Sequence, residues 1–575
     1  MKEIIRQKIE VAIRKALVKQ DEPTLSYFIK MIVAERTKDE SFGDYTSNIS
    51  MILNRSVAKA IDSHVGEFNW VVDPQNPGKY QNPHNIATEI KKYLDENKGD
   101  VIERVEAVEP GFLNFYLSSR YFEGVLGEVL EKDGHFGDIV IGAGVKVNNE
   151  FISANPTGPL HLGNARGGFY GDALSRILRK AGYDVTNEYY VNDAGEQVLK
   201  LGHSVLKDEE AVYAGEYIDE LHERIADKNG DVREIGEEMA GIVLEEMIKP
   251  TVSEKMGIPV DRWISEKRDI VDAGLVDRAI DMLKEKGLTF ESEGALWLKT
   301  TAFGDDKDRV LVKSDGSRTY FASDCGYLLH KKDRGFSRLI LTLGADHHGY
   351  KARLLAAAKA FSFEGDFDFT FVQLVRLMKD GKEVRMSKRA GNVVTIDELL
   401  EKVPVDVARF FFLMYSPDTH MNFDLGLAEE RSAKNPVYYV QYAHARASSI
   451  LRKADEAGVS PGGADLSLLS HPKEQALLRE LSFFPELVEE AAAERAPHKL
   501  PQYAIRLADK LHSFYDECRV IDAENMELSK ARLLLVSATR SVLNETLSLL
   551  GVSAPERMES ADNTQESAMT ETKNE

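Results

Sequence analysis

Cysteine is scarce in this sequence, since its 575 residues include only Cys325 and Cys518. The two lie 193 positions apart (518 − 325), so no CxxC pair is available for a zinc site. We expect both to be buried free thiols in a reducing compartment, and we expect no metal site built by the protein. The sequence also lacks an apolar run long enough to cross a membrane and a secretory segment at its start, which predicts a cytoplasmic protein that does not contact membranes.

An excess of basic residues is missing as well. The formal net charge is −22, which argues against a surface coated in cations for nucleic acid. Charge is nevertheless unevenly distributed, because residues 559–575 alone carry five acids and one lysine. Local basic regions can still bind RNA in an acidic protein, so net charge by itself excludes no function.

The hydrophobic pattern divides the chain into parts of different type. Residues 1–118 are typical of an α+β domain, residues 411–558 of an all-helical bundle, and residues 559–575 of a disordered tail. Between them, residues 119–410 alternate strands and helices, which predicts a doubly wound, Rossmann-type α/β domain with a charged helical insertion at about 200–290. The expected strands of its sheet are Val145–Ser153, Val185–Val191, Leu339–Leu343 and Phe369–Leu374.

An irregular turn joins the first of these strands to a helix expected over 164–181. Residues 152–168 read ISANPTGPLHLGNARGG, in which two prolines and a glycine interrupt the backbone. Ligands of open α/β sheets bind outside the carboxyl ends of the strands, and a helix N-terminus attracts phosphate. His161 can donate to phosphate oxygens, and Gly163 leaves room for a flat base. The pattern therefore predicts a nucleotide site, although an ordinary turn with a surface histidine is the alternative.

A second polar loop lies past the last expected strand. Residues 381–392 read GKEVRMSKRAGN and place two lysines and two arginines between glycines. Such a loop can close cations over a polyphosphate as charge develops. A solvated basic turn is the alternative, but its coincidence with the histidine–glycine turn in one α/β domain favours function.

Together the two loops resemble the HIGH and KMSKS motifs of class I aminoacyl-tRNA synthetases, as HLGN at 161–164 and RMSKR at 385–389. The wider resemblance is to the arginyl-tRNA synthetase family and covers nearly the whole chain. It rests on residues 153–164, YVNDAG at 190–195, GADHHGY at 344–350, FGDY at 42–45, YVQYAHAR at 439–446 and LGVSAPER at 550–557. Two departures are Arg385 in place of the first lysine and Asn164 in place of the second histidine. The loop Asp73–Pro83 is longer than expected.

This resemblance implies that arginine is activated by ATP to an adenylate and transferred to the 3′ end of tRNA(Arg). It implies ATP with Mg²⁺ as substrate, no tightly bound cofactor and a monomer, with an N-terminal domain that contacts tRNA and a helical anticodon-binding domain. Catalytic roles are implied for His161 and Lys388. The implied ATP-binding residues are His161, Gly163, Asn164, Met386, Ser387 and Lys388. The implied arginine-binding residues are Glu150, Ser153, Asn155, Glu266, Tyr320, Asp324 and His347.

Three other functions compete with this interpretation. A cysteine-specific synthetase would be expected to carry zinc-binding cysteines, which this sequence lacks. A small-molecule nucleotidyltransferase has no need of a helical C-terminal domain. A non-enzymatic RNA-binding relative has no need of His161, Gly163 and Lys388, all of which are present.

Overall fold

The structure is a computed structural model that describes residues 1–17, 29–37, 39–62, 82–347, 349–384 and 394–558. The expected tail 559–575 and most of the loop Asp73–Pro83 lie outside these residues. The chain divides into two compact units: residues 1–136, 450–486 and 509–542 form one, and residues 137–449, 487–508 and 543–575 form the other. Among the described helices, none is long and apolar enough to cross a membrane.

The first unit contains a four-stranded antiparallel sheet near the start of the chain. Its strands are, in spatial order, β1 (Glu35–Arg36), β2 (Tyr45–Ser47), β4 (Phe112–Leu117) and β3 (Ile102–Val108). The helices beside it are α1 (Lys2–Ala16), α3 (Ile49–Asp62) and α4 (Pro83–Asn97). Ile9, Ile90 and Phe115 are fully buried, so apolar residues at helical and alternating spacing meet in one core. Further along the chain the unit includes α5 (Ser119–Lys132) and α17 (Pro472–Ser482).

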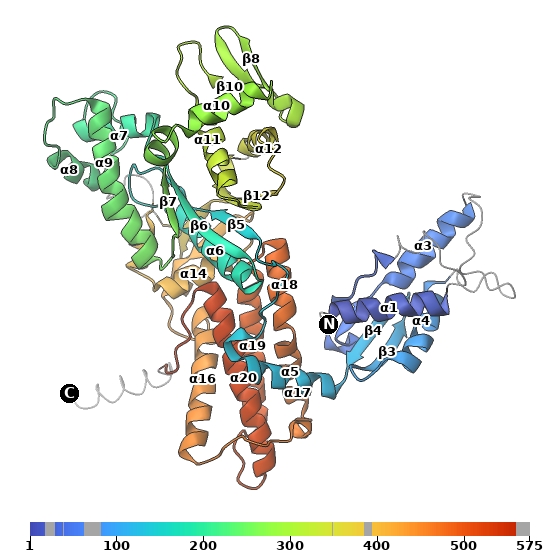
Figure 1. The fold of residues 1–575 in the computed structure, drawn as a ribbon. Coiled ribbons are helices and arrows are strands. Elements are labelled where there is room, and N and C mark those ends of the chain that lie inside the picture. Colours follow the sequence, from blue (N-terminus) through green and yellow to red (C-terminus); the bar gives the residue numbers. More distant parts are fainter. Residues whose placement is uncertain (18–28, 38, 63–81, 348, 385–393, 559–575) are drawn as a thin grey trace, which may run out of the picture. The chain divides into compact units, whose positions relative to one another are not determined.

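The second unit is built on a five-stranded parallel sheet (Figure 1). Its strands are, in spatial order, β12 (Asp366–Val372), β11 (Arg338–Gly344), β5 (Lys146–Glu150), β6 (Asp184–Val191) and β7 (Arg262–Ser265). Numbered along the chain and read from β7 to β12, they lie 3-2-1-4-5, which is the doubly wound order and confirms the predicted fold class. β5 is shorter than the expected strand 145–153, because Ile152 and Ser153 have φ angles of 68° and 40° and leave the extended conformation.

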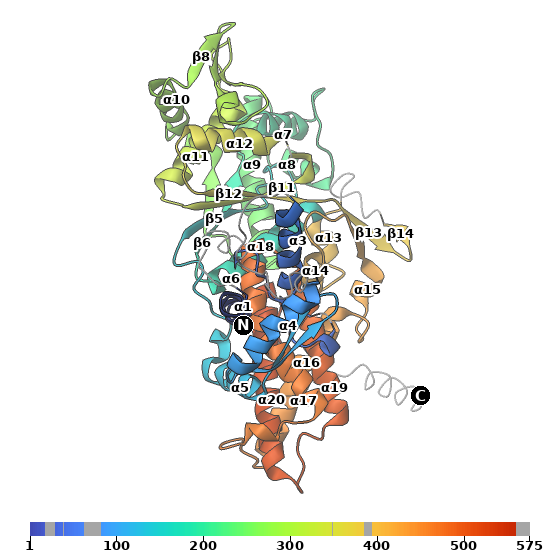
Figure 2. The same ribbon diagram turned by 90° about the vertical axis from the view of Figure 1, so that its right-hand side faces the viewer.

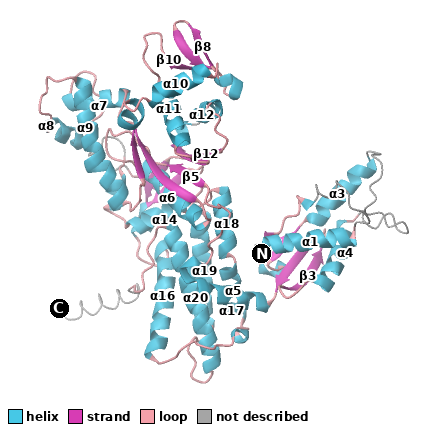
Figure 3. Cartoon of the chain, in the orientation of Figure 1, coloured by secondary structure: helices cyan, strands magenta, loops and turns pink. Residues whose placement is uncertain are grey.

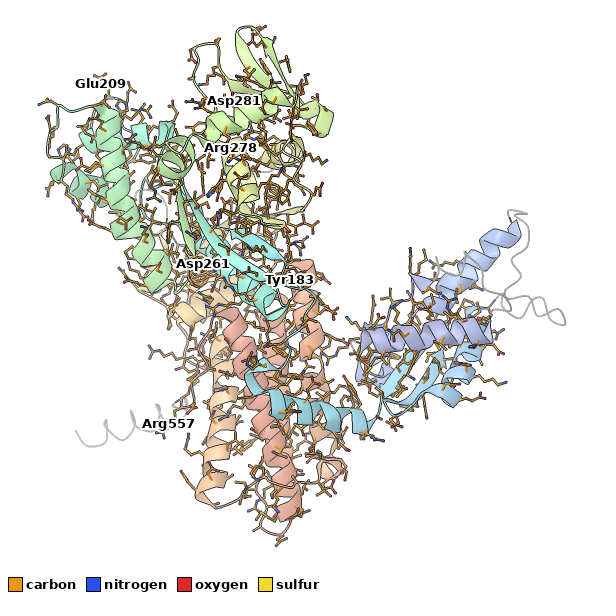
Figure 4. The ribbon with its side chains drawn as sticks, viewed as in Figure 1. Tyr183, Glu209, Asp261, Arg278, Asp281 and Arg557 are labelled. Atoms are coloured by element: carbon orange, nitrogen blue, oxygen red, sulfur yellow. The ribbon has the colours of Figure 1, made fainter. Side chains whose placement is uncertain are left out.

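The strand order reverses between β5 and β11, where Glu150 is paired with Leu341. The crevice outside the carboxyl ends of these strands is where ligands bind in such sheets. Helix α6 (Leu162–Lys180) follows the β5 turn and packs closely, since a Cβ at Gly171 would lie 2.3 Å from the Phe151 ring. Tyr183 and Asp261, labelled in Figure 4, directly precede β6 and β7 at the opposite, amino-terminal end of the strands.

The span 200–290 was predicted to be helical, but it also contains β7, which extends the parallel sheet. A strand of four residues with an exposed arginine is too short to show the alternation of a longer strand. The helices before it are α7 (Glu196–Leu206), α8 (Glu216–Glu223) and α9 (Val232–Ile242), which lie together in Figure 1. After it come the π-helical turn Glu266–Val271, α10 (Leu275–Glu285), the small antiparallel sheet of β8 (Thr289–Ser292), β9 (Ala295–Leu298) and β10 (Arg309–Val312), and α11 (Tyr320–Asp333).

The region after residue 411 is mostly helical but also contains a strand. β15 (Met421–Asp424) pairs with β13 (Val375–Lys379), which forms a hairpin with β14 (Lys382–Glu383), as Figure 2 shows. The prediction that strands end before 411 is therefore wrong, because β15 is stabilised by a partner 46 positions earlier (421 − 375) rather than by local pattern. The long helices α16 (Pro436–Glu456), α19 (Lys499–Glu517) and α20 (Met526–Leu550) lie side by side in Figure 3. Cys325 and Cys518 are buried and free, as predicted.

Candidate functional site

A cavity of about 1200 Å³ opens in the second unit where the sheet order reverses. Its walls come from the turn after β5, the start of α11, the turn after β11 and the α7–α8 segment. All of the predicted site residues that the structure describes line this cavity: Glu150, Ser153, Asn155, His161, Gly163, Asn164, Glu266, Tyr320, Asp324 and His347. Met386, Ser387 and Lys388 lie outside the described residues.

The turn after β5 has a strained backbone that side-chain hydrogen bonds stabilise. Ile152 and Ser153 have positive φ angles, which cost about 1–3 kcal/mol each in residues other than glycine. The Ser153 hydroxyl donates to Glu150 Oε1 at 3.1 Å and accepts the Tyr190 N–H at 3.1 Å. Ser153 therefore fixes the start of the turn against the neighbouring strand β6.

His161 caps the helix that follows this turn. Its Nδ1 accepts the N–H groups of Gly163 at 3.1 Å and Asn164 at 3.2 Å, and the Asn164 side chain accepts the His161 N–H at 3.1 Å. Because Nδ1 is an acceptor, the neutral ring carries its proton on Nε2. Partial burial lowers the pKa of His161, against the opposing effect of Asp346, so the ring remains neutral at pH 7. Nδ1 forms the cap, so the Nε2–H of the imidazole is left as a donor at the N-terminus of the helix.

Asp324 provides an unsatisfied negative charge beside the cavity. It lies in the second turn of α11, and its Oδ2 is buried without a hydrogen-bond partner among the described residues. Burial raises the pKa of Asp324 to about 6, against the lowering effect of the Arg353 cation. An ionised carboxylate in such a place is costly unless a donor or cation pairs with it, so the site favours a cationic ligand.

Tyr320 begins the same helix and is not a core residue. Its side chain is 47% exposed, and its hydroxyl accepts the N–H of Glu196 at 2.9 Å. A Cβ at Gly195 would lie 3.1 Å from the Tyr320 ring, so glycine lets the two segments meet. The ring is left as a wall of the cavity next to Asp324.

Glu150 already has a cationic partner inside the protein. Its Oε2 accepts from the ammonium of Lys331, and both residues are buried. The Lys331 ammonium also lies 4.2 Å from the ring centroid of Tyr327, whose hydroxyl donates to Glu188 at 2.7 Å. Because Lys331 neutralises Glu150, Asp324 is the better acceptor for a cationic ligand.

Glu266 is a second acid with a raised pKa. Glu266 is buried at the start of the π-helical turn. When the amide of Asn192 is oriented with its nitrogen toward nearby acceptors, that nitrogen donates to Glu266 Oε2 at 2.7 Å. Burial raises the pKa of Glu266 to about 7, and the charges of Asp324 and Asp193 add to the rise. A cation in the cavity would favour the ionised form of both Glu266 and Asp324.

The ends of two loops reach the cavity from other directions. His347 is half-buried after β11, with its Nε2 3.4 Å from Asp346 Oδ2, and its ring forms a T-shaped pair with Tyr350 at 5.1 Å between centroids. Val394 accepts the N–H of Leu162 at 3.3 Å. The first residues described after the RMSKR segment therefore lie beside the helix that His161 caps.

Several cavity residues were not predicted from the sequence. They are Asn192, Gln197, Tyr213, Tyr217, Lys331, Asp346 and Gln373. Asn192 and Asp346 fall within the motifs YVNDAG at 190–195 and GADHHGY at 344–350, so these motifs could have indicated both residues. The others come from helices, the insertion and a strand end, where nothing local distinguishes them from surface or core residues. Among the described residues, no cluster of histidine, cysteine or acidic side chains could hold a metal ion.

Three protein-family models match this chain. Residues 3–117 match "Arginyl tRNA synthetase N terminal domain", residues 246–409 match "tRNA synthetases class I (R), catalytic domain", and residues 440–558 match "DALR anticodon binding domain". The three matches follow one another along most of the sequence.

Named relatives are similar over almost the entire chain. An arginine–tRNA ligase of Bacillus subtilis (strain 168) is 42% identical over 97% of this chain and 99% of its own length. One of Geobacillus kaustophilus (strain HTA426) is 43% identical over 97% of this chain and 98% of its own length. Among solved structures, Thermus thermophilus arginyl-tRNA synthetase matches with a TM-score of 0.70 and 25% identity, covering 97% of this chain and 100% of that one.

Proposed function

The chain belongs to the arginyl-tRNA synthetase family, and we propose that its large cavity holds arginine against Asp324 and ATP against His161. The enzyme is an arginine–tRNA ligase. It joins arginine to AMP from ATP, releases pyrophosphate, and transfers arginine to the 3′ end of tRNA. The reaction needs close positioning and charge stabilisation rather than a nucleophile of the enzyme, and the cavity offers both.

At the ATP end, the His161 Nε2 donor and the N-terminus of α6 face phosphate, and Gly163 faces adenine. Asn164 stands where the HIGH motif has its second histidine, and its side chain accepts the backbone N–H of His161 in the helix cap. Met386, Ser387 and Lys388 bind the triphosphate, and Lys388 neutralises the departing pyrophosphate. Mg²⁺ enters with ATP as part of the substrate.

At the arginine end, Asp324 accepts two parallel N–H groups of the guanidinium, and Tyr320 aligns the group. The orphaned Asp324 oxygen carries this assignment, because no other acid of the cavity has a buried oxygen left without a donor among the described residues. Glu266 adds a second negative charge. The α-amino and carboxylate groups of arginine lie toward Ser153, Asn155 and His347, and Glu150 supports that end through Ser153.

The domains before and after the catalytic domain contact tRNA. Residues 1–118 form the N-terminal tRNA-contacting domain, residues 119–410 the catalytic domain, and residues 411–558 the domain that binds the anticodon of tRNA(Arg). The matches at 3–117 and 440–558 support these assignments. We further propose that the enzyme acts as a monomer in the cytoplasm.

The function is tested by offering ATP, total tRNA and each amino acid in turn, and measuring which becomes attached to tRNA. Arginine alone is expected to be attached, with AMP and pyrophosphate as products. Attachment of a different amino acid, or ATP consumption that never loads tRNA, would contradict the proposal. The second outcome is the one expected of a small-molecule nucleotidyltransferase.

His161→Ala is expected to lower the rate of arginine activation by about a hundredfold, because a preorganised donor to the phosphates is lost. It also removes a helix cap, which typically costs about 1 kcal/mol of stability. His471 is the control, since its Nδ1 accepts the N–H of Lys473 at 3.3 Å and caps α17, with the Cys518 thiol also 3.3 Å away. His471→Ala should lower thermal stability by a similar amount but keep ATP use normal. Equal losses of activity in the two variants would mean that His161 serves only as a cap.

Arginine binding is expected to strengthen as pH rises through 6 and 7. The raised pKa values of Asp324 and Glu266 mean that both carboxyls must lose a proton before they pair with the guanidinium. Affinity should therefore be weak below about pH 6 and level off above about pH 7.5, with a change on the order of a hundredfold if both must ionise. Calorimetric titration of arginine at a series of pH values measures this change and the protons released.

Glu266→Gln separates the two carboxyls in the same titration. This variant should lose the part of the pH dependence centred near 7 and keep the part near 6 that belongs to Asp324. A pH-independent affinity in the unaltered enzyme between about pH 5.5 and about pH 8 would exclude both carboxyls as ligands of the cation.

A further inference from the structure

Tyr217 of the insertion contacts the turn between β5 and α6. The hydroxyl of Tyr217, in the first turn of α8, donates to the backbone oxygen of Thr157 at 3.2 Å. A Cβ at Gly158 would lie 3.0 Å from both Cζ and Oη of Tyr217. The ring therefore rests directly on the turn between β5 and His161, and both sides of this contact line the cavity.

Tyr217 is held in place by the segment before it and the helix that carries it. Ser204 Oγ accepts the N–H groups of Val212 at 3.1 Å and Tyr213 at 2.9 Å, which ties the loop back onto α7. Ile218 and Leu221 bury the inner face of α8. Burial raises the pKa of Tyr217 to about 12, so its hydroxyl remains a donor across the working pH range.

The other end of the same segment contacts the arginine side of the cavity. The N–H of Glu196, the first residue of α7, is accepted by the Tyr320 hydroxyl at 2.9 Å. Helices α7 and α8 thus link the wall that contains Tyr320 to the turn that contains Thr157 and Gly158. Tyr217, Glu196 and Tyr320 all lie outside the two sequence motifs that predicted the ATP site.

We propose that Tyr217 is a positioning residue for ATP, which fixes the turn at Thr157 and Gly158 so that His161 and the α6 N-terminus meet the phosphates. This inference rests on the proposed function. The turn begins with two residues at positive φ, and such a backbone persists only where surrounding contacts hold it. Ser153 supplies that contact at one end of the turn, and Tyr217 supplies it at the other.

Tyr217→Phe tests the proposal because it removes only the hydroxyl. The KM for ATP is expected to rise about two- to tenfold, the effect of one lost hydrogen bond, while the KM for arginine stays within about twofold. Gly158→Ala should act in the same direction by pushing the ring away. The double variant should resemble Gly158→Ala alone, because the bond is already broken there, whereas independent sites would give multiplied effects.

Tyr183→Phe is the matched control. Tyr183 lies before β6 at the amino-terminal end of the strands, where its hydroxyl is 3.4 Å from an Arg338 nitrogen, so its loss should leave both KM values unchanged (Figure 4). An unchanged KM for ATP in Tyr217→Phe would overturn the proposal. So would equal rises in both KM values with a lowered melting temperature, which indicate a structural role only. Failure of the proposed function itself would appear separately, as absence of arginine attachment in the unaltered enzyme.

Discussion

Asp324→Asn is expected to raise the KM for arginine by about thirty- to several-thousand-fold, which corresponds to about 2–5 kcal/mol. The substitution keeps the shape of the side chain but removes its charge and replaces one acceptor oxygen with a donor. That donor faces the N–H groups of the guanidinium, so a buried cation is left poorly paired. Lysine has a similar charge, so arginine is selected by the fit of the guanidinium's fixed fork of N–H donors to the two carboxylate oxygens, rather than by negative potential alone.

The measurement is steady-state charging of tRNA at limiting arginine, with ATP varied in a second series. The KM for ATP should hardly change, because the residues around His161 are untouched. Asp333→Asn is a matched control on the same helix, since Asp333 pairs with Arg278 at the surface and does not line the cavity. Near-normal charging by Asp324→Asn at limiting arginine would refute the assignment and move the guanidinium site to Glu266 and Glu150.

Lys388→Ala is expected to lower turnover by about a hundredfold, or about 3 kcal/mol, with a much smaller change in ATP affinity. If the ammonium acts on charge that develops on the leaving pyrophosphate, its loss weakens the transition state more than the bound substrate. Lys388 lies outside the described residues, but the next described residues, Val394 and Thr395, lie beside Leu162 and His161. Single-turnover formation of the adenylate measures the chemical step directly.

Lys379→Ala is the control for this variant, because the Lys379 ammonium pairs with Glu429 at 2.7 Å on the surface of β13. It removes a lysine nine positions earlier in the sequence (388 − 379), and this lysine does not line the cavity. Normal turnover in Lys388→Ala together with weakened ATP binding would show that the lysine contributes to ground-state binding only.

Sequence patterns predicted the parallel α/β sheet, the irregular turn before α6 and ten of the residues that line the cavity. These features depend on interactions between near neighbours in the chain. Apolar runs specify strands, and the group formed by His161, Gly163 and Asn164 specifies a capped helix within four residues. Strands β7 and β15 were missed because each has only four residues and is stabilised by a partner strand remote in the sequence.

The pairing of charged side chains in the cavity depends on contacts between elements that are far apart in the sequence. Glu150 and Asp324 are both acids implied to bind arginine, and the sequence does not show which of them has a cationic partner inside the protein. Lys331, 181 positions from Glu150, neutralises that acid, whereas Asp324 keeps a buried oxygen without a partner among the described residues. Likewise Tyr217 meets Thr157 from 60 positions away. Pairing and burial of side chains on different elements follow from packing, which brings together residues that the local pattern of the chain does not connect.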